Sequence, residues 1–193
     1  MAVADAPVGV LAEGWEGLRV AEQLQRLLPR EDVVVLADHA YAPYARRPAA
    51  VVADRVLRLV ETLRREHGCK LVVLASLQAT LDAGPAAGAV GMTLAPAVAR
   101  AAAAAGGTVG VWLEPGSVRG LQLRDELRRA RLRGTPVSAP EEAAVGPAEL
   151  AEIAAQRARG ALRRSGLAAV RKRPGRRILV STAPAAAPPP VAS

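Results

Sequence analysis

The chain has 193 residues, 51% of them hydrophobic, which is enough to bury the core of one α/β domain or of two small lobes. It has no Phe, two Trp and two Tyr, so Leu, Val and Ala must build that core, while its single cysteine excludes an internal disulfide and any multi-thiolate metal site. Residues 1–100 carry 11 Lys+Arg and 11 Asp+Glu, whereas residues 101–193 carry 15 and 7, so the net charge of +8 lies in the second half and predicts a basic face there.

Short apolar runs alternate with helical patterns along the first half of the chain. The apolar runs, which predict buried strands, are VGVL (8–11), VVVLA (33–37) and LVVLA (71–75). Between them, apolar residues recur at helical spacing, namely Leu18, Ala21, Leu24 and Leu28, then Val52, Val56, Leu59, Val60 and Leu63. This alternation of strand and helix predicts a parallel sheet with crossover helices.

The pattern is interrupted at GPAAGAVG (84–91), whose glycines and proline predict a turn-rich loop. A second series of elements follows, which we expect to be a helix at 97–105, a strand at 108–113, a basic helix at 117–133, a strand at 136–140, a helix at 147–164 and a strand at 177–182. The last residues are rich in Pro and Ala and predict an extended, disordered tail.

The sequence shows no targeting or membrane signal. No segment reaches the ~18 consecutive apolar residues of a membrane-spanning helix. The first residues lack the basic stretch and apolar run of a signal peptide, so a cytoplasmic location is expected.

Five segments, in order and at similar spacing, together resemble one known family. They are VGVLAEGWEGLRV (8–20), LLPREDVVVLADHAYAPYARR (27–47), LVVLASLQAT (71–80), TLAPAV (93–98) and RRILVSTAP (176–184). They are similar to the V-x-F-D-S-G-x-G-G-L, L-P-x-E…G-D-x-A-x-x-P-Y-G, A-C-N-T-A, I-E-P-A-V and L-G-C-T-H-x-P segments of the glutamate racemase branch of the Asp/Glu racemase superfamily.

This resemblance implies two α/β lobes, residues 1–92 and 93–183, each a parallel sheet flanked by helices, with a cleft between them and a tail at 184–193. Ser76 and Ser181 are expected to face each other across the cleft. In the family, the chain normally continues past the second catalytic strand and returns to cover the first lobe. The resemblance therefore also favours a homodimer, in which a second copy would cover that lobe.

The resemblance implies cofactor-independent, two-base racemisation, an isomerase reaction that supplies the cell wall, in which two cysteines act as acid and base. Those positions align with Ser76 and Ser181. A hydroxyl is a far weaker acid than a thiol, and no neighbouring base is evident in the sequence to activate either serine. Two-base racemisation is therefore not expected, and the serines are interpreted as replacements that fill thiol-sized space.

The supporting residues of the family are replaced as well. The aspartate and serine of D-S-G align with Ala12 and Glu13, the N-T of C-N-T with Leu77 and Gln78, and the histidine of C-T-H with Ala183. The resemblance implies that the substrate pocket is lined by Glu13, Gly14, His39, Pro43, Tyr44, Gln78, Thr80 and Thr182. No metal site or cofactor is expected, and Cys69 is interpreted as an inert small side chain.

Three hypotheses about function remain open at this stage. The first is a non-catalytic homologue, a pseudoenzyme that binds a small amino or carboxylic acid or serves a regulatory role. The second is a divergent isomerase that uses Glu13 or His39 as its base. The third is a regulator that binds nucleic acid or an acidic protein through the basic face at 119–177, although that segment lacks the interleaved aromatic residues of a base-stacking surface.

Overall fold

The structure is a computed structural model, and it describes residues 3–105, 109–111, 125, 128, 134–136, 147–167 and 178–182. A short 3-10 helix, η1 (Val3–Asp5), precedes the first strand. The strands of the main sheet are β1 (Val8–Ala12), β2 (Val33–Ala37), β3 (Leu71–Leu74), β4 (Val90–Gly91) and β7 (Ile178–Thr182). The helices are α1 (Glu16–Leu27), α2 (Ala49–Arg65), α3 (Leu77–Ala87), α4 (Ala95–Ala105) and α6 (Pro147–Ser165), with a 3-10 helix η2 (Tyr44–Arg46) before α2.

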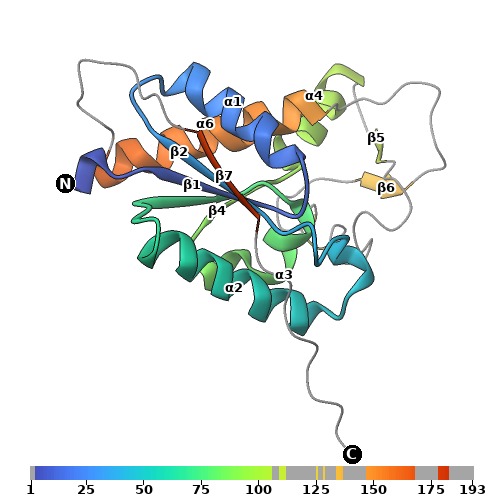
Figure 1. Cartoon of the computed structure of the whole chain (residues 1–193). Helices are drawn as coiled ribbons and strands as arrows, with labels where there is room; N and C mark the ends of the chain where they lie inside the picture. The colour runs from blue at the N-terminus through green and yellow to red at the C-terminus, as the bar shows by residue number, and fades with distance from the viewer. Residues whose placement is uncertain are drawn as a thin grey trace, which may run out of the picture.

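The five strands form one parallel sheet in the order β4-β3-β1-β2-β7. Helices α1 and α6 lie on one face of the sheet, while α2 and α3 lie on the other (Figure 1). The strands are buried on both faces, which explains why they read as continuous apolar runs. The predicted parallel sheet with crossover helices is confirmed.

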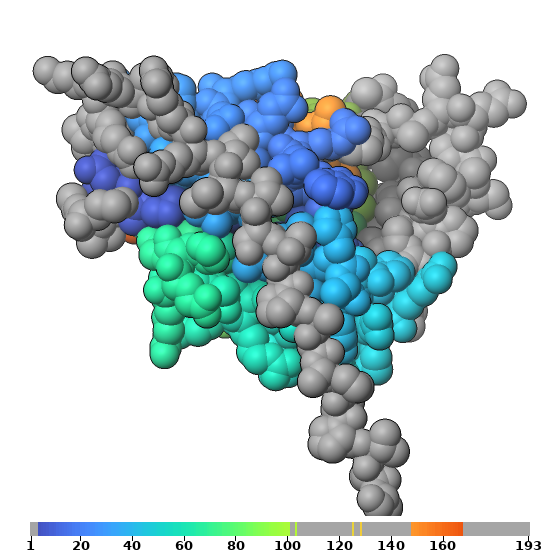
Figure 2. All heavy atoms as spheres, viewed as in Figure 1, coloured from blue at the N-terminus to red at the C-terminus, as the bar shows by residue number. Residues whose placement is uncertain are grey.

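Side chains alternate between two cores. Val10, Val35 and Val73 pack with α1 and α6 in one core, whereas their neighbours Leu11, Val34 and Leu74 pack with α2 and α3 in the other. In the space-filling view, α1 lies in the upper part of the visible face and α2 in the lower part (Figure 2).

Gly9 allows α2 to approach the sheet closely. A Cβ at this position would lie 3.0 Å from Cys69 Sγ and 3.2 Å from Leu63 Cδ1. Cys69 is buried there, and burial raises the pKa of its thiol to about 12, so the thiol stays protonated and fills space as expected.

The predicted loop at 84–91 is only partly correct. Helix α3 continues through Gly84 and Pro85 to Ala87, and it ends at Gly88, whose φ of 56° is left-handed. The remaining residues include the short strand β4, which pairs with β3. Burial of Ala79, Ala83 and Ala87 against the sheet outweighs the low helix propensity of Gly and Pro.

The last strand and the last helix differ from the expected two-lobe arrangement. Strand β7 pairs with β2 in the main sheet, in the register Val35↔Val180, instead of lying in a separate second sheet. Helix α6 packs on α1, since alanines on its buried face allow close approach. Strand β7 and helix α6, which the two-lobe prediction assigns to the second lobe, therefore pack on β2 and α1.

The rest of the expected second lobe is only partly described. Strands β5 (Val109–Val111) and β6 (Gly134–Pro136) form a separate two-stranded parallel sheet. Most of the predicted basic helix at 117–133 and the tail at 184–193 lie outside the described residues. No helix in the part of the chain that the structure describes is long and apolar enough to cross a membrane.

Candidate functional site at the carboxyl edge of the sheet

Three of the sequence-predicted residues, Glu13, His39 and Ser76, follow neighbouring strands at one edge of the sheet, and Asp38, which was not predicted, lies with them. Glu13 follows β1, Asp38 and His39 follow β2, and Ser76 follows β3. Because β3, β1 and β2 are adjacent and parallel, their carboxyl ends meet at one edge, which is where sheets of this class bind ligands.

Glu13 and Ser76 form a direct hydrogen bond. The Ser76 hydroxyl donates to Glu13 Oε1 over 2.6 Å, and the backbone N–H of Tyr44 donates to Glu13 Oε2, also over 2.6 Å. Burial raises the pKa of the Glu13 carboxyl, opposed by these two hydrogen bonds. The expectation that Ser76 has no neighbouring base is therefore wrong, since strand pairing brings a carboxylate 63 positions away in the sequence to its hydroxyl.

Ser76 also begins helix α3. Its side-chain oxygen accepts a hydrogen bond from the N–H of Ala79 over 3.2 Å, as expected of an N-cap serine. The hydroxyl therefore has both a donor and an acceptor role, and both partners lie within the protein.

A second buried network starts at Asp38. Its carboxylate, 0% exposed, accepts two hydrogen bonds from Arg55, at 3.0 Å from Nε and 2.8 Å from Nη2, and one from the Tyr44 hydroxyl at 2.9 Å. These hydrogen bonds to Asp38 raise the pKa of Arg55, and burial raises the pKa of Tyr44. Tyr44 links the two networks through its backbone and its side chain.

Sequence reasoning missed Arg55, although a signal was present. Arg55 lies on the apolar face of α2, between Val52 and Val56, and is 7% exposed. An arginine on the buried face of a helix requires a carboxylate partner.

His39, in the turn after β2, contacts Trp15, which lies two residues after Glu13 in the turn after β1. Their ring centroids are 4.7 Å apart, and Trp15 is 68% exposed, an unusual exposure for an indole. His39 Nε2 is buried and has no hydrogen-bond partner among the described residues. The pair was not predicted, because nothing in the sequence shows that the turn after β1 reaches the turn after β2.

The remaining predicted residues have mainly local contacts. The Gly14 N–H donates to Glu16 Oε1 over 2.9 Å, Pro43 is exposed after a cis peptide bond, and Gln78 is buried in the first turn of α3. The Thr80 hydroxyl donates to Ser76 O and accepts from the Met92 N–H, so it joins α3 to the segment after β4 and does not join the Glu13 group.

Ser181 and Thr182 lie at the same sheet edge, but on β7. Their backbones are level with Leu36 and Ala37 of β2, so β1 and β2 lie between β7 and β3. Three strand steps separate β7 from β3, or about 14 Å. This arrangement differs from the expectation that Ser76 and Ser181 face each other across a cleft between two lobes.

No group of metal-binding side chains occurs among the residues that the structure describes. Of the basic segment 119–177, the described part is Asp125, Arg128, β6, α6 and the two residues after α6. Asp125 and Arg128 are exposed, and Arg128 Nη1 lies 3.6 Å from Asp125 Oδ1. The predicted binding of an anionic partner by this segment stays a prediction.

The described elements define an α/β protein whose fold is similar to that of solved glutamate racemases. Glutamate racemase from Thermus thermophilus, solved with beta-chloro-D-alanine, matches 94% of this chain with a TM-score of 0.71 and 25% identity, over 90% of its own chain. A glutamate racemase isoform from Bacillus anthracis matches 91% of this chain with a TM-score of 0.70 at 20% identity, over 88% of its own chain.

Sequence comparison gives the same relationship over part of the chain. Glutamate racemase from Deinococcus radiodurans is 41% identical over 133 residues, which are 64% of this chain and 44% of the relative. That from Pseudomonas putida is 38% identical over 127 residues, 62% and 47% respectively. No protein-family model matches the chain.

The protein is therefore a homologue of the glutamate racemases. It spans about half the length of these two curated relatives.

Proposed function

We propose that this glutamate racemase homologue does not racemise amino acids and instead has a binding or regulatory role. The observation that carries the proposal is the 2.6 Å hydrogen bond from the Ser76 hydroxyl to Glu13. At the position that resembles a catalytic thiol, the chain has a weak acid whose hydrogen-bonding capacity is used within the protein.

The arrangement of the strands supports the same proposal. Two-base racemisation needs an acid and a base on opposite sides of one Cα, within hydrogen-bonding reach of it. Ser76 follows β3 and Ser181 is on β7, and the two strands β1 and β2 lie between β3 and β7. Asp38 forms an ion pair with Arg55 and accepts a hydrogen bond from the Tyr44 hydroxyl, so both of its carboxylate oxygens are engaged within the protein.

The ligand of such a protein would be a small amino or carboxylic acid. Tyr44 N–H and the Ser76 hydroxyl already donate to a carboxylate, that of Glu13. An incoming carboxylate would therefore have to displace Glu13, and replacing Glu13 should increase the affinity. Titration of Glu13→Ala and unaltered protein with D- and L-glutamate measures this, and equal affinities would contradict it.

A second candidate function is favoured by the same pair. Glu13 is a partly buried carboxyl with a raised pKa at a sheet edge, which is a common environment of a general base. In this alternative, the protein is a divergent isomerase in which Glu13 removes a proton from the substrate, with His39 as the other candidate base.

The deciding experiment is deuterium uptake at Cα of D- and L-glutamate and aspartate in heavy water. We expect no exchange by the unaltered protein, and none by Ser76→Cys/Ser181→Cys, because β3 and β7 are too far apart. Exchange by the unaltered protein that is lost in Glu13→Gln would establish the isomerase. Exchange that survives in Glu13→Gln and is lost in His39→Gln would assign His39.

A further inference from the structure

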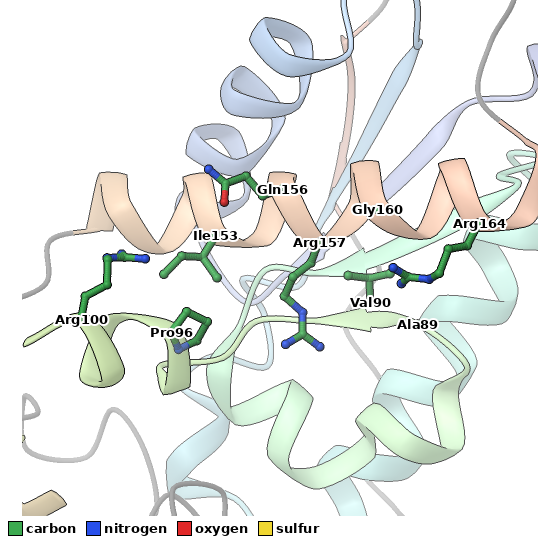
Figure 3. A pocket seen from close by; sticks show the side chains of 9 residues that line it. All are labelled: Ala89, Val90, Pro96, Arg100, Ile153, Gln156, Arg157, Gly160 and Arg164. Atoms are coloured by element: carbon green, nitrogen blue, oxygen red, sulfur yellow. The ribbon is translucent and has the colours of Figure 1, made fainter. Parts of the chain in front are cut away.

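A groove at the β4 edge of the sheet lies between α4, β4 and α6. Its volume is about 440 Å³, and its lining includes one apolar residue from each of these elements, Pro96 of α4, Val90 of β4 and Ile153 of α6 (Figure 3). This volume falls within the range of small-molecule sites. The groove lies along edge strand β4, and none of its lining residues belongs to the Glu13–Ser76 group.

Two arginines of the groove come from one face of α6. Arg157 and Arg164 are seven residues apart, or two helical turns, and their side chains extend from α6 toward β4 (Figure 3). Between them lies Gly160, which has no side chain to fill the space. Both arginines are exposed, and neither has a hydrogen bond or ion pair with another described residue.

A third arginine stands at the other end of the groove. Arg100 of α4 forms an ion pair with Glu149 of α6, so its charge is already balanced. The excess positive charge of the groove therefore comes from Arg157 and Arg164. Two guanidinium groups beside apolar lining residues recognise an anion that carries an organic group.

We propose that this groove binds a small phosphorylated molecule, with the phosphate held by Arg157 and Arg164 and the organic part against Val90, Pro96 and Ile153. Guanidinium groups bind phosphate through paired N–H donors. None of the described residues that line the groove is aromatic, so none offers a surface on which nucleic acid bases would stack, which favours a small ligand over a single-stranded nucleic acid. This site is independent of the proposed function.

The test compares inorganic phosphate with phenyl phosphate as ligands, using calorimetry on the full chain. Phenyl phosphate should bind more tightly, because only its ring contacts the apolar lining residues. Arg157→Ala/Arg164→Ala should weaken its binding at least about tenfold, and Arg157→Lys/Arg164→Lys should weaken it less, because the charge remains while the paired donors are lost.

The control is Arg19→Ala/Arg163→Ala, which removes the same charge from exposed positions outside the groove. We expect it to bind phenyl phosphate as the unaltered protein does. An equal loss in both double variants would show nonspecific attraction and overturn the proposal. Absence of saturable phosphate binding would overturn it too, and so would arginine-dependent binding of only oligoglutamate or single-stranded DNA.

Discussion

At the scale of single residues, Ser76 holds two elements together through one hydroxyl. It caps α3 by accepting from Ala79, and it joins β3 to β1 by donating to Glu13. The same side chain thus stabilises a helix terminus and satisfies a partly buried carboxylate. This double role gives the serine at this position a structural function.

Replacing Ser76 by Ala should lower the free energy of unfolding by about 1–3 kcal/mol, since it removes the cap and leaves Glu13 without one donor. Urea unfolding measures the change. Ser165→Ala is the control, because Ser165 is exposed and donates only to Leu162 O of its own helix. Its effect should stay within about 0.5 kcal/mol. Equal effects of the two variants would contradict the double role of Ser76.

Glu13 predicts a dependence of stability on pH. Burial raises the pKa of its carboxyl in the folded state above the ordinary value of a glutamate. A raised folded-state pKa means that the native state holds the proton more tightly, so the contribution of Glu13 to stability is greatest below the unfolded pKa and is lost as the pH rises through the folded pKa. Glu13→Gln removes this titration.

Between about pH 4 and about pH 7, the unfolding free energy of the unaltered protein should therefore fall relative to that of Glu13→Gln. Urea unfolding at both pH values measures this shift. Glu22→Gln, at an exposed position of α1, should show no such trend. A pH-independent difference for Glu13→Gln would mean that the hydrogen bonds from Ser76 and Tyr44 cancel the effect of burial.

At the scale of secondary structure elements, the Asp38–Arg55 pair attaches α2 to the end of β2. Arg55 makes two hydrogen bonds to a carboxylate that is 0% exposed. Tyr44 in η2 donates to the same carboxylate, so three successive elements converge on one buried charge. Loss of Arg55 would leave that charge without its counter-ion.

Arg55→Met should destabilise the protein by about 3–5 kcal/mol, because breaking one side of a buried ion pair leaves a desolvated charge. The matched variant is Arg58→Met on the same helix, where Arg58 pairs with Asp54 at the exposed surface. That change should cost at most about 1 kcal/mol. Thermal unfolding compares them, and similar midpoints would show that Asp38 does not depend on Arg55.

The sequence predicted helix boundaries correctly where the conformational preference of the local residues agreed with their burial in the tertiary structure. Helices α1 and α2 were predicted from apolar spacing and are confirmed, because their periodic residues alone determine one buried face, and the helix predicted at 147–164 is confirmed as α6. The end of α3 was not, because Gly84 and Pro85 favour a turn in isolation. Contact of the α3 alanines with α2 and the sheet, which no local window contains, extends the helix.

At the scale of the whole molecule, residues from the second half complete the core of the first. Ala154, Ala155 and Leu162 of α6 are 0% exposed and belong to the core that contains α1 and β1. Strand β7 extends the same sheet beyond β2. The first half of the chain is thus covered by a helix and a strand that are distant in sequence.

Ala155→Glu should lower stability by more than about 3 kcal/mol, because it places an unpaired charge between α6 and the main core. Gln156→Glu makes a similar change in charge at the next residue, which is exposed, and its effect should stay within about 0.5 kcal/mol. Thermal unfolding compares the two. Equal unfolding midpoints would show that α6 does not cover the main sheet in solution.

The sequence by itself determined the parallel α/β class, the core faces of α1 and α2, and the edge of the sheet where polar residues gather, because periodicity and strand order are local or nearly local properties. Only the tertiary structure decided that Glu13 reaches Ser76, that Arg55 neutralises Asp38 and that β7 joins β2. Those contacts link residues far apart in the chain, and the free energy that selects them comes from burial and strand pairing across the whole sheet, which no single segment encodes.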